Sequence, residues 1–426
     1  MAKFNVLVFP AGEQNSIELH DALCSCVNIK LYGASSVGLE RHAPYVFENF
    51  ISGLPHISES CFVERLNDVI LEHDIDVIFP THDTVALYFS GNTDLIKAKI
   101  VVTDKQTASI CRDKKKTYEI FEKKEFTPKI YEAIESFPVF IKPRMGQGAV
   151  GTKLLKAMEQ IPNDIDLSEY VICEYLPGEE YTVDCFTDRH GNLSYISPRS
   201  RQRLFAGIST AGRTEILTDE IKYIAESINK QLNFIGLWFF QIKKDNIGKF
   251  KLLEISTRTA GSMCLTRAKG INLPLLSVYA VMGYDVDTIP NSYVVSMDRA
   301  FISRYSINYE YDTVYLDFDD TLILNGKVNL KIIYFLFQCR NKNKNVILLT
   351  KHDKDINKSL DKYGINVGLF SKIIHLRISD DKSKFIADQS AIFIDNSFNE
   401  RKEVYNVCNI PVFDVDTVEV LLDWRS

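Results

Sequence analysis

The sequence predicts a multidomain protein of α/β and α+β class, with a doubly wound parallel sheet near each end and antiparallel sheet between them. In residues 1–105, short β-branched runs alternate with helical patterns, which is typical of a parallel sheet covered by helices. Residues 106–308 contain adjacent strands joined by turns, as in an antiparallel sheet. From residue 309, apolar strands and helices alternate again. The 426 residues are enough for about three domains.

The elements of the first domain follow from its apolar runs. We expect helices at residues 16–25 and 61–73, and strands at residues 4–12, 28–36, 74–83 and 98–105. The turn after the first strand, FPAGEQNS, contains a single glycine. It therefore lacks the GxGxxG pattern with which such a turn binds a dinucleotide.

The middle domain begins with a charged helical stretch at residues 112–126, RDKKKTYEIFEKKEF. A strand at 137–143, a glycine-rich loop and a strand at 152–157 come next. Strand pairs are expected at 170–186, around a Pro-Gly turn, and at 234–258, around an NIG turn. The expected result is an antiparallel sheet flanked by helices.

The last domain is predicted from three buried strands separated by helical patterns. The strands are VYLDFDDTL at 314–322, NVILLTKH at 345–352 and AIFIDNS at 391–397. The segment NYEYD at 308–312 is the expected junction with the middle domain. Continuous apolar strands of this kind indicate a second parallel sheet.

Charge, hydropathy and cysteine content argue against several classes of function. The formal net charge is −6, and no Lys/Arg tract with interleaved aromatic residues occurs, so we expect no nucleic-acid partner. No apolar stretch approaches the roughly 18 residues of a membrane helix, and the N-terminus lacks a signal-peptide pattern. The nine cysteines lack metal or CxxC spacing. We therefore expect a cytoplasmic protein with reduced thiols and no membrane partner.

The segment FIKPRMGQGAVGT at residues 140–152 places Gly146, Gly148 and Gly151 in GxGxxG spacing. In a dinucleotide-binding domain such a loop opens a helix, but a strand is expected after this one. A P-loop would need GxxxxGK[ST], which is absent. The glycines alone fit two alternatives, namely a flap that folds over phosphates and a glycine-rich hairpin without a ligand.

Polar residues around the loop favour a nucleotide. Lys142 ends the strand that leads into the loop, and Lys114 could supply a second cation to a phosphate. Gln241 and Glu254 lie on strands that are expected to pair. An amide oxygen that faces a carboxylate suits Mg²⁺.

Taken in order and spacing, these motifs resemble the ATP-grasp superfamily over about residues 1–290, especially its carbamoyl-phosphate-synthase-like and amino-acid-ligase branches. The resemblance implies a Rossmann-like pre-ATP-grasp domain at 1–105 and an ATP-grasp domain at 106–308. It implies an enzyme that uses ATP and Mg²⁺ to activate a carboxylate as an acyl phosphate, which an amine or similar nucleophile attacks. Members of this superfamily are often homodimers, so a homodimer is a possible state.

The resemblance also assigns roles residue by residue. These are Lys114, Lys142, Gly146 and Gly148 at the phosphates, Glu174, Tyr175 and Leu176 at the adenine, Glu180 at the ribose, Gln241 and Glu254 at Mg²⁺, and Arg258 at the acyl phosphate. One position departs from the superfamily, because Ser256 in EISTR stands where an ExNxR pattern commonly has Asn. Either water completes the shell of a second Mg²⁺, or that ion is held more loosely.

Four arginines lie in the segment SPRSRQRLFAGISTAGRTE at residues 197–215. Arginine suits bidentate recognition of carboxylate or phosphate groups. We expect Arg201 and Arg203, with Arg258, to bind substrate. A solvated basic loop is the alternative.

Asp317 and Asp319 end the apolar strand in VYLDFDDTL. Burying carboxylates without a partner is costly, so a cation is expected beside them. The C-terminal edge of a parallel sheet is also where such sheets bind ligands.

This segment resembles the first motif of the haloacid dehalogenase (HAD) superfamily. The resemblance covers about residues 311–426 and implies a HAD-like domain at 309–426. It implies that Asp317 is the nucleophile and Asp319 the general acid/base, that Thr350 and Lys382 (or Lys384) hold the phosphoryl group, and that Asp317, Asp319 and Asp395 bind Mg²⁺. Asn396 and Asn399 stand where a second acidic residue is usual, which predicts a weaker metal site. The short span from Asp317 to Thr350 leaves no room for a large cap.

The leading hypothesis is a bifunctional enzyme, a carboxylate–amine ligase fused to a phosphatase that acts on a related phosphorylated metabolite. The ligase would act first and the phosphatase on its product. In a second hypothesis the HAD-like domain is a non-catalytic accessory module. In a third, the protein binds ATP for regulation and does not ligate.

Overall fold

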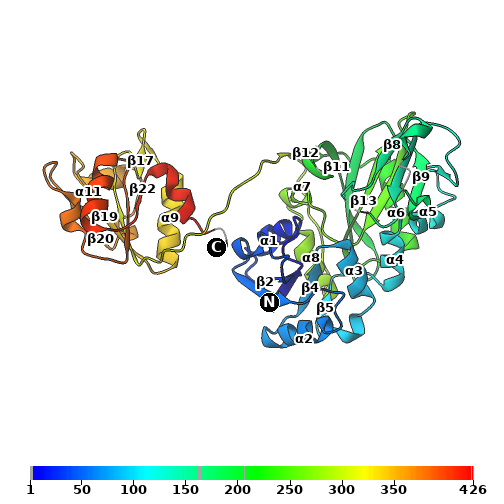
Figure 1. Cartoon of the computed structure of the whole chain (residues 1–426), viewed down its shortest axis with the longest axis horizontal. Coiled ribbons are helices and arrows are strands. Elements are labelled where there is room, and N and C mark those ends of the chain that lie inside the picture. The colour runs from blue at the N-terminus through cyan, green and yellow to red at the C-terminus, as the bar shows by residue number, and fades with distance from the viewer. Residues whose placement is uncertain (1–2, 147, 162–164, 206, 424, 426) are drawn as a thin grey trace. The chain divides into compact units, whose positions relative to one another are not determined.

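The computed structural model describes residues 3–423 and 425, apart from 147, 162–164 and 206. Gln147 of the glycine loop and Ala206 of the arginine-containing segment thus lie outside the described residues. The chain forms two compact units, residues 1–301 and 302–426, each of which is described by itself (Figure 1). No helix in the described part of the chain is long and apolar enough to cross a membrane.

The first unit begins with the predicted parallel sheet, which has five strands in the order β3-β2-β1-β4-β5. Their bounds are β1 Phe4–Phe9, β2 Ile29–Ser36, β3 Asn49–Leu54, β4 Val77–Pro80 and β5 Lys99–Ile100. The helices are α1 Ser16–Leu23, α2 Phe62–Glu72, α3 Asp83–Ser90 and α4 Lys105–Arg112. The central strand β1 shows why the sheet is buried on both faces. Val6 and Val8 point into one apolar cluster, and Leu7 and Phe9 into another.

Two antiparallel sheets complete the first unit, as predicted. The smaller has the order β6-β9-β7-β8 and the larger β14-β13-β10-β11-β12-β15. Their bounds are β6 Ile130–Tyr131, β7 Val139–Pro143, β8 Lys153–Leu155, β9 Tyr170–Glu174, β10 Glu180–Thr187, β11 Leu193–Phe205, β12 Ile208–Thr214, β13 Gly236–Lys244, β14 Phe250–Ser256 and β15 Ser296–Asp298. Helix α6 (Asp219–Gln231) packs Ile221, Ile224 and Ile228 into the core of the larger sheet, while α7 (Cys264–Ala268) and α8 (Leu273–Val281) follow β14.

The charged stretch at 112–126 is not one helix, which corrects the sequence prediction. Helix α4 ends at Arg112, and α5 (Lys114–Ile120) starts after a break at Asp113. The Asp113 carboxylate accepts a hydrogen bond from the Lys115 amide, so it caps α5. It also pairs with Arg144 at 2.6 Å, which fastens the helix start to the strand before the glycine loop.

The second unit contains the predicted second parallel sheet, in the order β20-β19-β16-β21-β22. Its bounds are β16 Thr313–Leu316, β19 Asn345–Thr350, β20 Lys372–His375, β21 Ala391–Ile394 and β22 Val412–Phe413, with helices α9 Leu330–Asn341, α10 Ile356–Lys362 and α11 Phe398–Cys408. Between β16 and β19 the chain forms only the small hairpin β17–β18 (Ile323–Leu324 and Lys327–Val328) and helix α9. The predicted domain boundaries at residues 105 and 308 stay predictions.

Candidate active site

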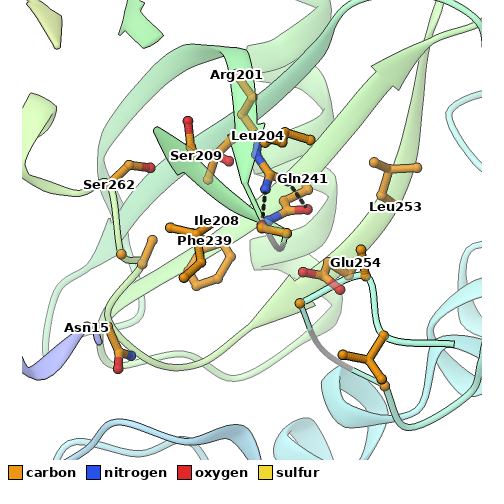
Figure 2. A pocket seen from close by; sticks show the side chains of 18 of the residues that line it. Asn15, Arg201, Leu204, Ile208, Ser209, Phe239, Gln241, Leu253, Glu254 and Ser262 are labelled. Carbon is orange, nitrogen blue, oxygen red and sulfur yellow. Dashed lines mark hydrogen bonds between the residues drawn. The ribbon is translucent and has the colours of Figure 1, made fainter. Parts of the chain in front are cut away.

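A pocket of about 380 Å³ lies in the first unit (Figure 2). Its wall includes the turn after β1, the end of β4, the glycine loop, and strands β10, β11, β13 and β14. The polar residues in that wall are Glu13, Gln14, Asn15, Thr81, His82, Lys114, Lys142, Thr152, Glu180, Thr182, Arg201, Ser209, Gln241, Glu254, Arg258 and Ser262. The pocket therefore brings together most residues that the sequence nominates for ATP, Mg²⁺ and substrate.

Two buried lysines lie under the glycine loop. The Lys114 Nζ donates to the Gly146 carbonyl at 3.0 Å and lies 3.5 Å from the Glu254 carboxylate. The Lys142 Nζ donates to the Leu253 carbonyl at 3.1 Å and contacts the Tyr118 hydroxyl at 2.5 Å. Burial lowers the pKa of both lysines. A phosphate group beside them would favour their charged form and reverse that shift.

The glycine loop closes one side of the pocket. Gly148 and Gly151 have φ of +61° and +74°, which residues with a side chain rarely adopt. At the tip of the β11–β12 hairpin, a Cβ on Gly207 would lie 2.2 Å from the Gly148 carbonyl oxygen. The loop and the hairpin tip therefore touch backbone to backbone, which only glycine permits.

Gln241 and Glu254 are direct cross-strand partners on β13 and β14, as the sequence predicts. Both line the pocket. One carboxylate and one amide oxygen suit Mg²⁺, which commonly keeps several waters and takes further ligands from a nucleotide. In the part of the chain that the structure describes, no cluster of three or more His, Cys, Asp or Glu side chains could hold a metal. These residues therefore fit a metal bound together with phosphate oxygens.

Arg201 on β11 links the predicted ribose and metal residues. Its guanidinium donates to Gln241 Oε1 at 2.9 Å (Figure 2). It also donates to the Gly207 carbonyl at 2.7 Å and forms an ion pair with Glu180. Its side chain is only 8% exposed. Glu180 also lies 3.7 Å from Lys243. Arg201 is thus a buried cation inside the predicted metal and ribose region.

Arg258 is held by a residue that the sequence did not single out. Asp83, the first residue of α3, pairs with Arg258 at 3.0 Å and accepts a hydrogen bond from Ser256 at 2.7 Å. Burial raises the pKa of Asp83, but Arg258 and Ser256 outweigh it and hold the pKa at about 2. Ser256, which stands where the ATP-grasp pattern commonly has Asn, therefore directs its hydroxyl to Asp83. Only the tertiary structure brings α3 to the end of β14.

Asn15 is a second residue that sequence reasoning missed. Its amide donates to the carbonyls of Thr81 and Thr259, at 2.7 and 3.0 Å. It therefore ties the first parallel sheet to the loop after β14, where Arg258 lies. Asn15 directly before α1 was the available signal, but a short polar residue before a helix is usually a cap.

Other nominated residues lie apart from the pocket wall. Glu174 accepts a hydrogen bond from the Lys129 amide, Tyr175 is exposed and Leu176 is buried, and none of the three lines the pocket. Arg203 pairs with Asp298 on the exposed side of β11, with more than half of its side chain accessible. The adenine and substrate roles of these residues stay predictions.

In the second unit, the nominated residues converge at the C-terminal edge of the sheet. Lys382 lies between two carboxylates, 2.7 Å from Asp317 and 2.6 Å from Asp395, and all three side chains are buried. Burial raises the pKa of Asp317 to about 6, and the Lys382 charge opposes that rise. The Thr350 hydroxyl is buried and without a partner in the described structure. Lys384 is exposed and pairs with Asp381, so Lys382 is the lysine of this cluster.

Asp319, two positions after Asp317, is exposed and pairs with His352 instead of Lys382. Its carboxylate is 2.8 Å from His352 Nδ1, and the other ring nitrogen of His352 is 2.8 Å from the Ser359 hydroxyl. His352 is a further residue that sequence reasoning missed, although it follows Thr350 by only two positions. The Asn396 amide nitrogen donates to Thr321 at 3.0 Å, so its backbone supports the loop after β16.

Comparison with known proteins gives three results. Residues 166–300 match the family model described as "ATP-grasp in the biosynthetic pathway with Ter operon". The N-terminal unit has the ATP-grasp fold. No curated protein sequence matches the chain.

Among solved structures, the ATP-grasp unit is similar to the biotin carboxylase domain of 2-oxoglutarate carboxylase from Hydrogenobacter thermophilus, with a TM-score of 0.57 and 14% identity over 69% of this chain and 74% of that chain. It is similar to the L-amino acid ligase from Bacillus licheniformis, with a TM-score of 0.52 and 14% identity over 66% and 74%. It is also similar to N5-carboxyaminoimidazole synthetase from Staphylococcus aureus, with a TM-score of 0.53 and 16% identity over 67% and 79%. The family match ends at residue 300, so a function for the second unit rests on its own geometry.

Proposed function

We propose that the ATP-grasp unit is an ATP- and Mg²⁺-dependent ligase that activates a carboxylate as an acyl phosphate for attack by an amine or similar nucleophile. The observation that carries the proposal is the convergence of Lys114, Lys142, Gln241, Glu254 and Arg258 on one pocket beside the glycine loop. Two of the similar proteins named above are a ligase and a synthetase, and the third is a carboxylase. All three names are consistent with carboxylate chemistry.

Each group of pocket residues has its own role in the proposed reaction. Lys114 and Lys142 bind the phosphates, and their burial strengthens that contact because little water competes with it. Gln241 and Glu254 would hold Mg²⁺, which supplies positive charge to the transferring phosphoryl group when bound. Arg258, fixed by Asp83, faces the acyl phosphate. The glycine loop and the β11–β12 hairpin exclude water, which would hydrolyse that intermediate.

The bonds formed in the reaction set its two steps. A carboxylate oxygen of the substrate attacks the γ-phosphorus of ATP, and the bond to ADP breaks. The nucleophile then attacks the acyl carbon, inorganic phosphate leaves, and the amine loses a proton. Glu13 and His82, which follow strands β1 and β4 in the pocket wall, could accept this proton.

The test is ADP release by the purified protein with Mg²⁺, with and without a small-metabolite extract. Parent and Glu254→Ala are compared, and Glu179→Ala, which removes an exposed carboxylate paired with Lys244, is the matched control. We expect extract-stimulated ADP formation by the parent and the control, but not by Glu254→Ala. ATP binding without stimulated ADP formation would favour a regulatory ATP-binding protein.

We propose a second activity for the C-terminal unit, a HAD-like phosphohydrolase. The specific observation that favours it is the buried cluster of Asp317, Lys382 and Asp395 beside the unpartnered hydroxyl of Thr350. Asp317 would attack phosphorus, Asp319 would donate and accept the proton, and Asp317 and Asp395 would hold Mg²⁺. The Thr350 hydroxyl and Lys382 would bind the phosphoryl oxygens.

Phosphate release from a panel of phosphorylated metabolites tests this second activity. Parent, Asp317→Asn and the exposed control Asp381→Asn are compared. We expect release by the parent and the control, and none by Asp317→Asn. Equal release by all three would show that Asp317 is not the nucleophile. No release by any of them, either from the panel or from the ligase product, would make this unit an accessory module. Ligation itself gives one phosphate per ADP, so a phosphatase that acts on the ligase product would release more phosphate than ADP once extract and ATP are supplied.

A further inference from the structure

The metal side of the ATP-grasp pocket is poor in negative charge. Of the two cross-strand partners there, Gln241 is neutral and Glu254 is the only carboxylate. The Glu254 carboxylate is already shared with the Lys114 ammonium at 3.5 Å. A Mg²⁺ ion at a nucleotide commonly takes one or two carboxylates from the protein in addition to phosphate oxygens, so a single shared carboxylate suits one ion better than two.

The remaining oxygen donors near this position are engaged elsewhere. The Ser256 hydroxyl donates to Asp83, and Asp83 in turn is paired with Arg258. The Glu180 carboxylate is paired with Arg201 and lies 3.7 Å from Lys243. Among the described residues that line the pocket, the last carboxylate is Glu13, which pairs with Arg41 at 3.3 Å.

A fixed cation already contacts the same oxygens. The Arg201 guanidinium is 2.9 Å from Gln241 Oε1, its Nη2 donates to the Gly207 carbonyl, and its side chain is 8% exposed. Figure 2 shows it lying against Gln241, within the pocket wall. Arginine remains charged at any physiological pH. Unlike a metal ion, its guanidinium is part of the chain, so no further anionic ligands are needed to hold it at the site.

We propose that this site works with one divalent cation per nucleotide and that the Arg201 guanidinium supplies the second positive charge. The inference rests on the proposed ligase function. Gln241 and Glu254 would hold the single ion together with nucleotide oxygens, and Arg201, which contacts both Gln241 and Glu180, would supply the positive charge of a second ion. Because the arginine is covalently part of β11, its charge is in position before the nucleotide arrives, with little reorganisation.

The test counts the Mn²⁺ ions that the full chain binds with a nucleotide and subtracts those that it binds without one, because the second unit has a proposed metal site of its own. A non-hydrolysable ATP analogue is kept below the protein concentration so that it is fully bound, and free Mn²⁺ is followed by its six-line electron paramagnetic resonance signal during a titration. The variants are Arg201→Met, Arg201→Lys and the control Arg189→Met. Arg189 is a surface arginine paired with Asp285 outside the pocket wall.

We expect one Mn²⁺ per analogue for the parent, for Arg201→Lys and for Arg189→Met. Arg201→Met should bind a second Mn²⁺, because Glu180 and Gln241 lose the guanidinium that contacts them both. Two ions in the parent, or a single ion in folded Arg201→Met, would overturn the inference while leaving the ligase proposal intact. If Arg201→Met does not fold, the number of Mn²⁺ ions that the parent binds per analogue still tests the inference. No analogue bound by the parent would overturn both.

Discussion

The contact between Asp83 and Arg258 predicts how much folding free energy is lost when the Asp83 charge is removed. Asp83→Asn keeps the shape of the side chain but removes the charge that faces Arg258 at 3.0 Å. The pKa of Asp83 falls from 3.8 to about 2 in the folded protein, because the attraction of Arg258 and the Ser256 hydrogen bond exceed the cost of burial. A difference of this size corresponds to ~2.5 kcal/mol of folding free energy. We therefore expect Asp83→Asn to destabilise the ATP-grasp unit by about 2 kcal/mol at pH 7.

The sign of the pH dependence follows from the lowered pKa. The carboxylate is ionised in both the folded and the unfolded states above about pH 4, so its stabilisation is fully present there. As the pH falls from about 4 to about 2, the unfolded state takes up a proton first and the stabilisation is lost. The parent should thus lose its advantage over Asp83→Asn across this window.

Urea unfolding followed by Trp238 fluorescence measures this effect, with Trp424→Phe as the background because the sequence has two tryptophans. Trp238 is fully buried in the core of the larger sheet. A double-mutant cycle with Arg258→Met should give a coupling energy of about 1–3 kcal/mol. Asp68→Asn, which removes an exposed carboxylate paired with Arg65, is the control and should cost less than about 0.5 kcal/mol. Equal stability of parent and Asp83→Asn at pH 7, or a coupling near zero, would refute the reasoning.

Three further predictions concern the loop, the phosphates and the second unit. Gly207→Ala should separate the hairpin from the glycine loop, since its Cβ would lie 2.2 Å from a backbone oxygen. We expect more ATP hydrolysis without ligation, and an unchanged ratio of ADP to ligated product would contradict this. Lys142→Met should raise the Kd for ATP at least 10-fold in calorimetry, whereas the exposed control Lys222→Met should not. Lys382→Met leaves two buried carboxylates unpaired, so the second unit should lose about 3–5 kcal/mol of stability; a loss below ~1 kcal/mol in urea unfolding would show that the lysine does not neutralise them.

The sequence by itself determined the order of the elements and the two kinds of sheet. Apolar runs such as residues 4–9 can be buried only between two layers, so the parallel sheets are readable from composition and periodicity. Paired strands with a tight turn, as at residues 236–256, place Gln241 opposite Glu254 because strand register follows the turn. In the second unit, Asp317 and Asp395 directly follow two neighbouring strands and Thr350 ends a third, so their convergence could also be predicted.

Only the tertiary structure decided which charges meet across distant segments. Asp83 and Arg258 are separated by 175 positions, being residues 83 and 258, and neither strand periodicity nor capping predicts that they pair. The Asp113–Arg144 pair, the Arg201 contacts with Glu180 and Gln241, and the His352–Asp319 pair likewise join segments that are distant in the sequence. Local patterns fix which face of an element is buried, but the partner of a buried charge depends on how whole sheets pack, and that packing places Asp83 beside Arg258 and Arg201 beside Gln241.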